Sequence, residues 1–170
     1  MLPGIKEVVF SAEVIDAAVE QVATELTQRY AGKDPLFLIV MNGAYVFAAD
    51  LLRRFNHPCS MVFIQIKSYR GTSRYVLDAD ESHIPDLTNR HVIIIEDIVD
   101  SGATLAWLQQ QITGQNAASV FSVALLNKLV PHAADADLYA LEVDDRFIVG
   151  YGLDVDGRFR NLPFIGVMED

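Results

Sequence analysis

Apolar residues occur along the chain in short, nearly unbroken runs. Such runs are typical of strands that are buried on both faces, as in a parallel sheet covered by helices. They predict strands at residues 36–41, 61–66, 92–95, 120–126 and 147–149. The run at 92–95 has no polar residue on either face, so we expect this strand to be buried on both sides.

Between these runs, apolar residues recur at helical spacing. The pattern predicts a helix from about Ser11 to Tyr30, with Ser11 as its N-cap, and further helices over 45–55 and 104–112. Strands that alternate with helices indicate an α/β protein. We therefore expect an open, mostly parallel sheet flanked by helices.

The segment from Ser68 to Arg90 differs from the rest of the chain because it is mostly polar and long. Connections of this length in compact domains are usually lids, binding loops or disordered segments. A short hairpin around residues 75–77 is the structural alternative. The two interpretations are compatible, since a lid can contain short strands.

Composition narrows the class of protein. The chain has 170 residues, 51% of them hydrophobic, which suits one domain with a sizeable core. No apolar run approaches the roughly 18 residues of a membrane span, and the first residues lack the layout of a signal peptide. The single cysteine, Cys59, rules out an internal disulfide and suits a reducing compartment, so we expect a cytoplasmic protein.

The formal net charge of −10 argues against a nucleic-acid-binding surface. It also means that an anionic substrate would be bound against the overall field of the protein. Local backbone amides, a few Arg and Lys side chains, or a divalent cation would have to hold it.

Polar residues follow four of the predicted strands directly. They are Asn42 and Gly43, then Lys67 to Tyr69, then Glu96 and Asp97, and finally Asn127 and Lys128. Ligands of open α/β sheets bind beyond the carboxyl ends of the strands. The four strand ends therefore predict one binding site at this edge.

The most informative of these strand ends is the one after residue 95. Glu96, Asp97 and Asp100 precede the small residues Ser101 to Thr104, which open a predicted helix. Free backbone N–H groups at a helix start form a cradle for phosphate. Carboxylates would repel a phosphate, so they are better suited to ribose hydroxyls or to Mg²⁺. The segment thus predicts a sugar-phosphate site.

The chain resembles the type I phosphoribosyltransferases in these residues. Residues 96–104 fit the signature of that family position by position, and residues 145–167 look like the tail of its hypoxanthine-guanine branch. Residues 67–69 and 125–128 match as well, so that the resemblance spans about 5–168. It implies one domain over residues 1–170, with a flexible lid loop at about 68–90 and a small purine-binding hood from about 128–170 plus the N-terminus.

The resemblance also implies a reaction and a set of substrates. A purine nitrogen would displace pyrophosphate from phosphoribosyl pyrophosphate, so that hypoxanthine or guanine yields IMP or GMP with Mg²⁺ as cofactor. Glu96 and Asp97 would face the ribose hydroxyls, and Asp100 would act as general base or acid near the purine. The backbone from Asp100 through Ser101, Gly102, Ala103 and Thr104 would hold the 5′-phosphate. A helix N-cap is the alternative role of Asp100.

The remaining roles are carried over from the family in the same way. Lys128 would donate to the oxygen at position 6 of the purine, Phe147 would stack on the ring, and Ile148 would read the base edge through its backbone. The family resemblance further assigns Mg²⁺ to Asp154, pyrophosphate to Asn42, Gly43 and Arg160, and lid closure to Ser68 and Tyr69. Alternatives are a core position for Phe147, a surface ion pair for Arg160, and an ordinary turn at Asn42-Gly43.

One departure from the family concerns the pyrophosphate turn. Close relatives often carry Lys-Gly where this chain has Asn42-Gly43, in a turn that the family holds with a non-proline cis peptide. Asn42 lacks the charge and length of lysine. Backbone contacts to pyrophosphate would survive this change, whereas a lysine contact would not.

Two other functions remain open at the level of the sequence. A regulator with this fold would bind phosphoribosyl pyrophosphate and nucleic acid, but the charge of −10 and the base-side set of Lys128, Phe147 and Asp154 weigh against it. A preference for xanthine is the other alternative. The family commonly forms homodimers or homotetramers, for which an apolar helix face near residues 45–52 is a candidate interface.

Overall fold

The structure is a computed structural model that describes residues 4–70, 75–79 and 84–168. Its helices are α1 (Ala12–Arg29), α2 (Tyr45–Arg54) and α3 (Ala103–Thr113). Its strands are β1 (Ile5–Phe10), β2 (Leu36–Met41), β3 (Ser60–Arg70), β4 (Tyr75–Ala79), β5 (His91–Val99), β6 (Ser119–Lys128), β7 (Leu138–Val143), β8 (Ile148–Val149) and β9 (Ile165–Met168).

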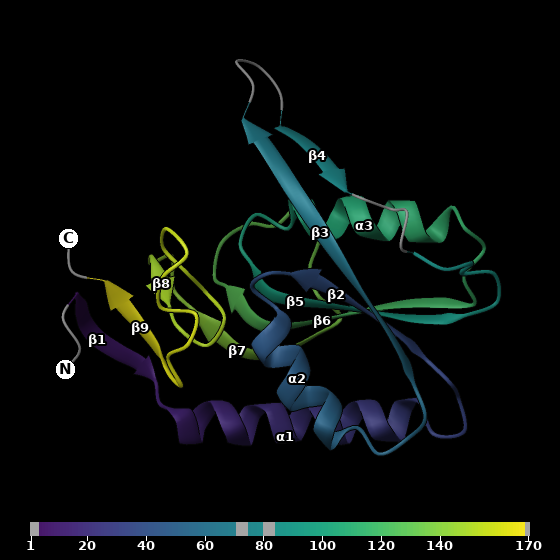
Figure 1. Cartoon of the computed structure of the whole chain (residues 1–170), viewed down its shortest axis with the longest axis horizontal. Coiled ribbons are helices and arrows are strands. Elements are labelled where there is room, and N and C mark those ends of the chain that lie inside the picture. Colours follow the sequence, from purple (N-terminus) through teal and green to yellow (C-terminus); the bar gives the residue numbers. More distant parts are fainter. Residues whose placement is uncertain (1–3, 71–74, 80–83, 169–170) are drawn as a thin grey trace.

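A six-stranded sheet forms the centre of the molecule (Figure 1). Its strand order is β4-β3-β2-β5-β6-β7, and all neighbours are parallel except the antiparallel pair β3 and β4. The expected α/β class with an open, mostly parallel sheet is therefore confirmed.

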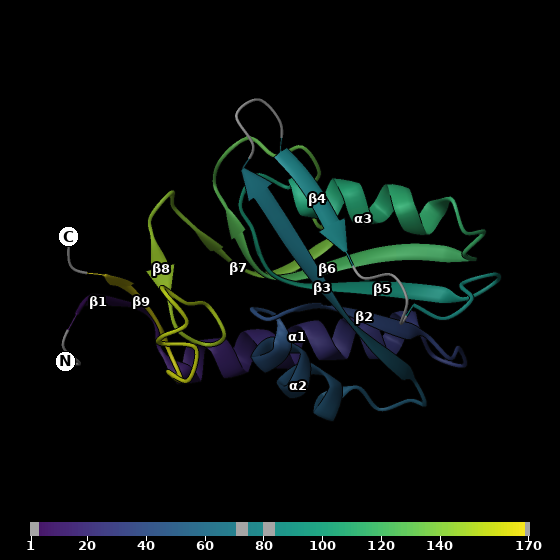
Figure 2. The same ribbon diagram turned by 45° about the horizontal axis from the view of Figure 1, so that its top comes forward.

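Helices cover both faces of this sheet. Residues of β2 and β5 point alternately to the two sides, so that Phe37 and Ile95 pack on the side of α1 and α2, whereas Leu38 and Ile94 pack on the side of α3. Figure 2 shows α1 and α2 on one side of the sheet and α3 on the other. Residues 92–95 are completely buried, which confirms the prediction of a strand that is covered on both faces.

The helix ends predicted from the sequence agree closely with the helix ends in the structure. The backbone N–H of Val14 donates to the Ser11 hydroxyl at 3.4 Å, so Ser11 is the N-cap of α1 as predicted. Helices α2 and α3 differ from the expected ranges by one residue at their ends. None of the helices in the described ranges combines the length and apolar character needed to cross a membrane.

A second, smaller sheet lies at one end of the molecule (Figure 1). Its antiparallel order is β1-β9-β8, so the strand expected at 147–149 belongs here and not to the large sheet. Strands β1, β7 and β9 had no expected counterpart. Their short sequences give no clear two-residue period. The pairing of β1 with β9 joins the two ends of the chain, which no local pattern signals. Residues 138–143, placed in the hood from the sequence, form β7 of the large sheet.

The segment expected as a lid contains a hairpin. β3 is longer than the strand expected at 61–66 and pairs with β4, with Ser68 opposite Leu77 and Tyr69 opposite Val76. In Figure 1, β3 and β4 extend past the ends of the other strands of the large sheet. The side chains of Ser68 and Tyr69, and residues 71–74 and 80–83 of the expected lid, lie outside what the structure describes.

Candidate active site

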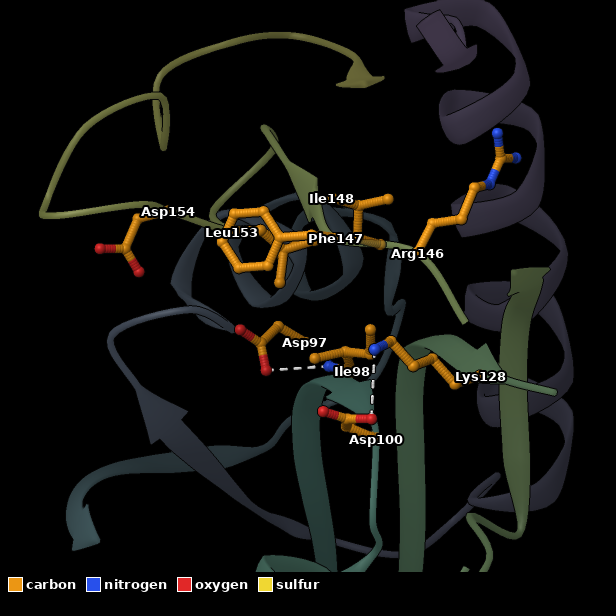
Figure 3. A pocket seen from close by; sticks show the side chains of 9 residues that line it. All are labelled: Asp97, Ile98, Asp100, Lys128, Arg146, Phe147, Ile148, Leu153 and Asp154. Carbon is orange, nitrogen blue, oxygen red and sulfur yellow. Dashed lines mark hydrogen bonds and ion pairs between the residues drawn. The ribbon is translucent and has the colours of Figure 1, made fainter. Parts of the chain in front are cut away.

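Three neighbouring cavities lie where the parallel strands end. One of about 180 Å³ is lined by residues of the large sheet and of the segment around β8 (Figure 3). A second of about 70 Å³ follows the backbone from Glu96 to Leu105, and a third of about 260 Å³ lies between the ends of β2 and β5. The position agrees with the site expected at the carboxyl ends of the strands.

Glu96 and Asp97 occupy the last part of β5. Glu96 is buried, and its Oε1 has no hydrogen-bond partner among the described residues. Burial, and then the charge of Asp97, raise the pKa of Glu96 well above its ordinary value. A buried acceptor without a partner is costly, so this carboxyl is suited to a hydroxyl donor from a ligand.

Asp97 is held more firmly than Glu96. Its Oδ1 accepts the backbone N–H of Ile98 at 2.8 Å, and Figure 3 shows its carboxylate facing the cavity. Burial raises the pKa of Asp97, while the backbone N–H groups and Arg160 act in the opposite direction. The two carboxyls thus share one small region, in which burial raises the pKa of each.

The turn into α3 has the geometry of an anion site. Gly102 has a left-handed backbone with φ of 71°, and a Cβ atom there would overlap the backbone of Ala134. The turn is braced by the Ala133 N–H, which donates to the Ser101 carbonyl at 2.8 Å. All of α3 is described, and its first turn carries no acidic residue. The N–H groups that begin α3 therefore face the second cavity with the positive end of the helix dipole.

The turn after β2 lies against the same carboxylates. The resemblance implied a non-proline cis peptide in the Asn42-Gly43 turn, and the structure has one at the bond just before Asn42, between Met41 and Asn42. Gly43 and Asp97 both line the third cavity, and the Asn42 side chain is exposed. The Gly43 carbonyl in turn faces Gly152, at which a Cβ would overlap it. This turn therefore links the strand ends to the segment that carries Asp154.

The first cavity has two walls. In Figure 3, Asp97, Ile98, Asp100 and Lys128 form one wall, and Phe147, Ile148, Leu153 and Asp154 form the other. The Phe147 side chain is 61% exposed, so the suggested core position for it does not hold. An exposed ring over a cavity is a surface on which a flat ligand can stack.

Lys128 is the only lysine among the described residues that line these three cavities, and it lies between two carboxylates. Its Nζ is 3.0 Å from Asp145 Oδ1 and 3.2 Å from Asp100 Oδ1. Burial alone would lower the pKa of Lys128, but hydrogen bonds and charge from Asp145 and Asp100 outweigh it and raise this pKa. Lys128 is therefore a charged donor at the base of the cavity.

Asp154 and Arg160 form an ion pair, with Arg160 Nη2 2.7 Å from Asp154 Oδ1. Arg160 also donates to the Gly152 carbonyl at 2.6 Å, and Asp154 Oδ2 accepts the Gly157 N–H at 2.7 Å. The ion pair that was the alternative role for Arg160 thus exists, although both side chains are partly buried, and its partner is the residue to which the resemblance assigned Mg²⁺.

Some residues of the site had no counterpart in the sequence analysis. Asp145 contacts Lys128, and Ile98, Arg146 and Leu153 line the first cavity. Asp145 opens the segment that resembles the family, but neither the resemblance nor the spacing assigned a role to it or to the lining side chains. Only the pairing of distant segments brings them together.

The chain is similar to proteins of known activity. The family model described as "Phosphoribosyl transferase domain" matches residues 10–156. The hypoxanthine-guanine phosphoribosyltransferase of Bacillus subtilis is 39% identical over an alignment that covers 99% of this chain and 96% of that protein.

Solved structures agree over nearly the whole chain. A hypoxanthine phosphoribosyltransferase from Staphylococcus aureus superposes with a TM-score of 0.92 at 30% identity, covering 98% of this chain and 92% of that one. The Trypanosoma cruzi hypoxanthine phosphoribosyltransferase, solved as a mutant with the product IMP, gives a TM-score of 0.88 at 30% identity over 99% of this chain and 87% of that one. The chain therefore belongs to the phosphoribosyltransferase family.

Proposed function

We propose that this protein is an enzyme of purine salvage. It transfers the phosphoribosyl group of phosphoribosyl pyrophosphate to hypoxanthine or guanine and releases IMP or GMP with pyrophosphate. The similarity to hypoxanthine-guanine phosphoribosyltransferases over 99% of the chain supports this substrate class.

One observation in the site carries the proposal furthest. Asp100 lines both the cavity of the α3 turn and the cavity of Lys128 and Phe147. It therefore lies between an anion cradle and a stacking surface. In a nucleoside monophosphate, the bond between sugar and base lies between a phosphate and a flat ring in the same way. The geometry suits a reaction that forms this bond.

The residues divide the work of the reaction accordingly. Backbone N–H groups of residues 101–104 hold the 5′-phosphate, and Glu96 and Asp97 accept the ribose hydroxyls. As the bond from C1 of the ribose to pyrophosphate breaks, a purine ring nitrogen forms the new bond to C1. Asp100 takes or shares the proton that this nitrogen loses. The carboxylates stabilise the positive charge that develops on the ribose.

On the base side, Lys128 donates to the oxygen at position 6, Phe147 stacks on the ring, and Ile148 offers backbone groups to the base edge. Asn42, Gly43 and Arg160 face the pyrophosphate. The β3–β4 hairpin with Ser68 and Tyr69 is the proposed lid over the reacting groups, where it would exclude water.

The donor set fits Mg²⁺ that is shared with the substrate. No cluster of three or more metal-binding side chains occurs in the described part of the chain, so the protein alone does not form a full cage. Carboxylates of Asp97 and Asp154 near the third and first cavities suit an ion that takes one or two protein ligands and completes its shell with substrate oxygens and water. When bound, Mg²⁺ neutralises charge on the pyrophosphate that leaves.

We further propose that the protein acts as a homo-oligomer in the cytoplasm. Tyr45, Met61 and Phe63 are 43%, 51% and 50% exposed and line an apolar hollow of about 330 Å³ together with Leu52. Exposed apolar surface of this kind favours contact with a second copy. Phe63→Glu should lower the mass measured by light scattering; an unchanged mass would contradict this interface. The lone Cys59 is consistent with a reducing compartment.

A product assay tests the proposed function. The purified chain is mixed with hypoxanthine, phosphoribosyl pyrophosphate and Mg²⁺, and IMP and pyrophosphate are measured by chromatography. We expect equal amounts of both products. For Asp100→Asn we expect turnover to fall by about 10² to 10⁴, the usual share of general acid–base catalysis, while binding of phosphoribosyl pyrophosphate persists. Absence of IMP from the wild-type mixture, and of GMP when guanine replaces hypoxanthine, would contradict the function. Loss of binding alone in the variant would contradict the role of Asp100.

A further inference from the structure

Lys128 connects the proposed general base with a carboxylate outside the expected site. It is the last residue of β6, whereas Asp100 follows β5 and Asp145 lies between β7 and β8. The Lys128 side chain is only 13% exposed, while those of Asp100 and Asp145 are 65% and 70% exposed. A largely buried ammonium thus has two carboxylates that compete for it.

The donors of the ammonium can be counted. A protonated lysine has three N–H groups. One donates to Asp145 in a hydrogen bond of 3.0 Å, and a second is directed to Asp100 at 3.2 Å, the contact that Figure 3 marks with a dashed line. Among the described residues this leaves a third N–H for the cavity that Lys128 shares with Phe147 and Ile148.

The contact with Asp145 changes what Asp100 can do. A carboxylate that is fully paired with an ammonium is a weaker proton acceptor, because the positive charge favours its ionised form. If Asp145 were absent, Asp100 would be the only carboxylate in contact with Lys128. The ammonium would then move toward Asp100 and away from a ligand in the cavity. Asp145 opposes this movement because it holds Lys128 from the other side.

We propose that Asp145 is a positioning residue of this site, which keeps Lys128 directed at the oxygen of the purine and leaves Asp100 free to exchange a proton. The inference rests on the proposed function. It adds a residue that does not contact the substrate itself. Asp145 acts on the base side, because its ion pair is with Lys128 and it is not among the residues that line the second and third cavities.

The chain offers a closely matched control. Asp144 is the adjacent residue, has the same charge, and is 72% exposed, but its contact is with Arg146 at 4.0 Å. Asp145→Asn and Asp144→Asn therefore remove the same charge at neighbouring positions. Asp145→Glu restores a carboxylate at an exposed position and serves as the conservative variant.

The test measures kinetic constants for hypoxanthine and for phosphoribosyl pyrophosphate in these variants. We expect Asp145→Asn to lower kcat/KM for hypoxanthine by about ten- to a hundredfold, the effect of losing one charge-assisted hydrogen bond. The KM for phosphoribosyl pyrophosphate should change less than about twofold. Asp144→Asn should match the wild type, and Asp145→Glu should recover most of the loss.

A double substitution shows whether Asp145 acts through Lys128. In a Lys128→Gln background, Asp145→Asn should change the residual kcat/KM by less than about twofold, because the partner that it positions is gone. An undiminished effect in that background, an equal rise of KM for both substrates, or identity of Asp145→Asn with Asp144→Asn would overturn the inference while wild-type activity persists. A wild-type chain that forms no IMP would overturn it together with the proposed function.

Discussion

Gly43 and Asp97 are in direct contact, although they lie in different segments of the chain. Gly43 follows β2 and Asp97 lies in β5, and a Cβ atom on Gly43 would overlap the Asp97 carboxylate. Because the contact leaves no space for a side chain, the proposed pyrophosphate turn and the proposed ribose carboxylate have one fixed relative position.

Gly43→Ala should therefore disturb the site without unfolding the protein. The added methyl group forces either the turn or Asp97 to move, and a displacement of about 1 Å in a reacting site costs on the order of a hundredfold in rate. We expect kcat/KM for phosphoribosyl pyrophosphate to fall by about this factor. Gly114→Ala is the control, since its Cβ would meet only ordinary contacts of 3.5 and 3.6 Å. Full activity of Gly43→Ala would show that the contact between Gly43 and Asp97 is not needed for the reaction.

Glu96→Gln should make the free protein more stable and less active. A folded-state pKa that is raised by burial means that the folded protein keeps a proton which the unfolded chain has lost. Ionisation of Glu96 thus lowers stability as the pH rises from the unfolded pKa through the folded one. The glutamine has no such penalty, so the variant should be more stable than the wild type near neutral pH.

Thermal unfolding at several pH values measures this effect. The gain should raise Tm by roughly 2–4 °C per kcal/mol for a chain of this length and should vanish below about pH 4. Asp34→Asn, at an exposed residue, should leave Tm unchanged at each pH. A gain in Tm that does not depend on pH would refute the explanation by ionisation.

Much of the large sheet was predictable, because its strands carry their signal locally. Residues 92–95 are apolar on both faces since α3 covers one side and α1 and α2 the other. The small sheet was not predictable in the same way. β1 and β9 are short and pair across the whole length of the chain, and the sequence contains no period that would join them.

In the candidate site, too, local features were predictable from the sequence and contacts between distant segments were not. Residues 96–104 have a recognisable order because one turn must offer both carboxyls and backbone N–H groups. The contact between Asp145 and Lys128 depends on how the segment after β7 lies against the end of β6, and no local pattern assigns this contact to Asp145. Contacts between distant segments were the part that required the structure.

Tyr151→Phe should weaken the attachment of the segment that carries Leu153 and Asp154. The Tyr151 hydroxyl donates to Asp50 Oδ2 of α2 at 2.5 Å, and burial together with Asp50 raises the pKa of this phenol. Loss of a hydrogen bond to a charged acceptor costs about 1.5–3 kcal/mol. Denaturant unfolding should show this loss, and the exposed Tyr45→Phe should show none. Equal stability of the two variants would mean that the Tyr151 contact contributes nothing.

Phe147→Leu should weaken the binding of the base and leave the fold intact. The ring is 61% exposed, so its removal disturbs little packing. Stacking of a base on an aromatic ring is worth about 1–3 kcal/mol, which predicts a rise of KM for hypoxanthine of about tenfold or more. Val8→Ala, which alters another exposed apolar side chain, is the control in the same assay. An unchanged KM would remove Phe147 from the proposed base site.

The most direct measurement of the central claim compares nucleobases under identical conditions. Hypoxanthine, guanine, xanthine and adenine are each supplied with phosphoribosyl pyrophosphate and Mg²⁺, and the nucleotide formed is quantified. Because the Lys128 ammonium has donors only, a purine with an amino group at position 6 leaves its third N–H without an acceptor. Adenine should therefore react about a hundredfold more slowly or worse. Formation of IMP and GMP with little AMP is the result we predict. Adenine turned over as well as hypoxanthine, or no nucleotide from any oxopurine, would contradict the account.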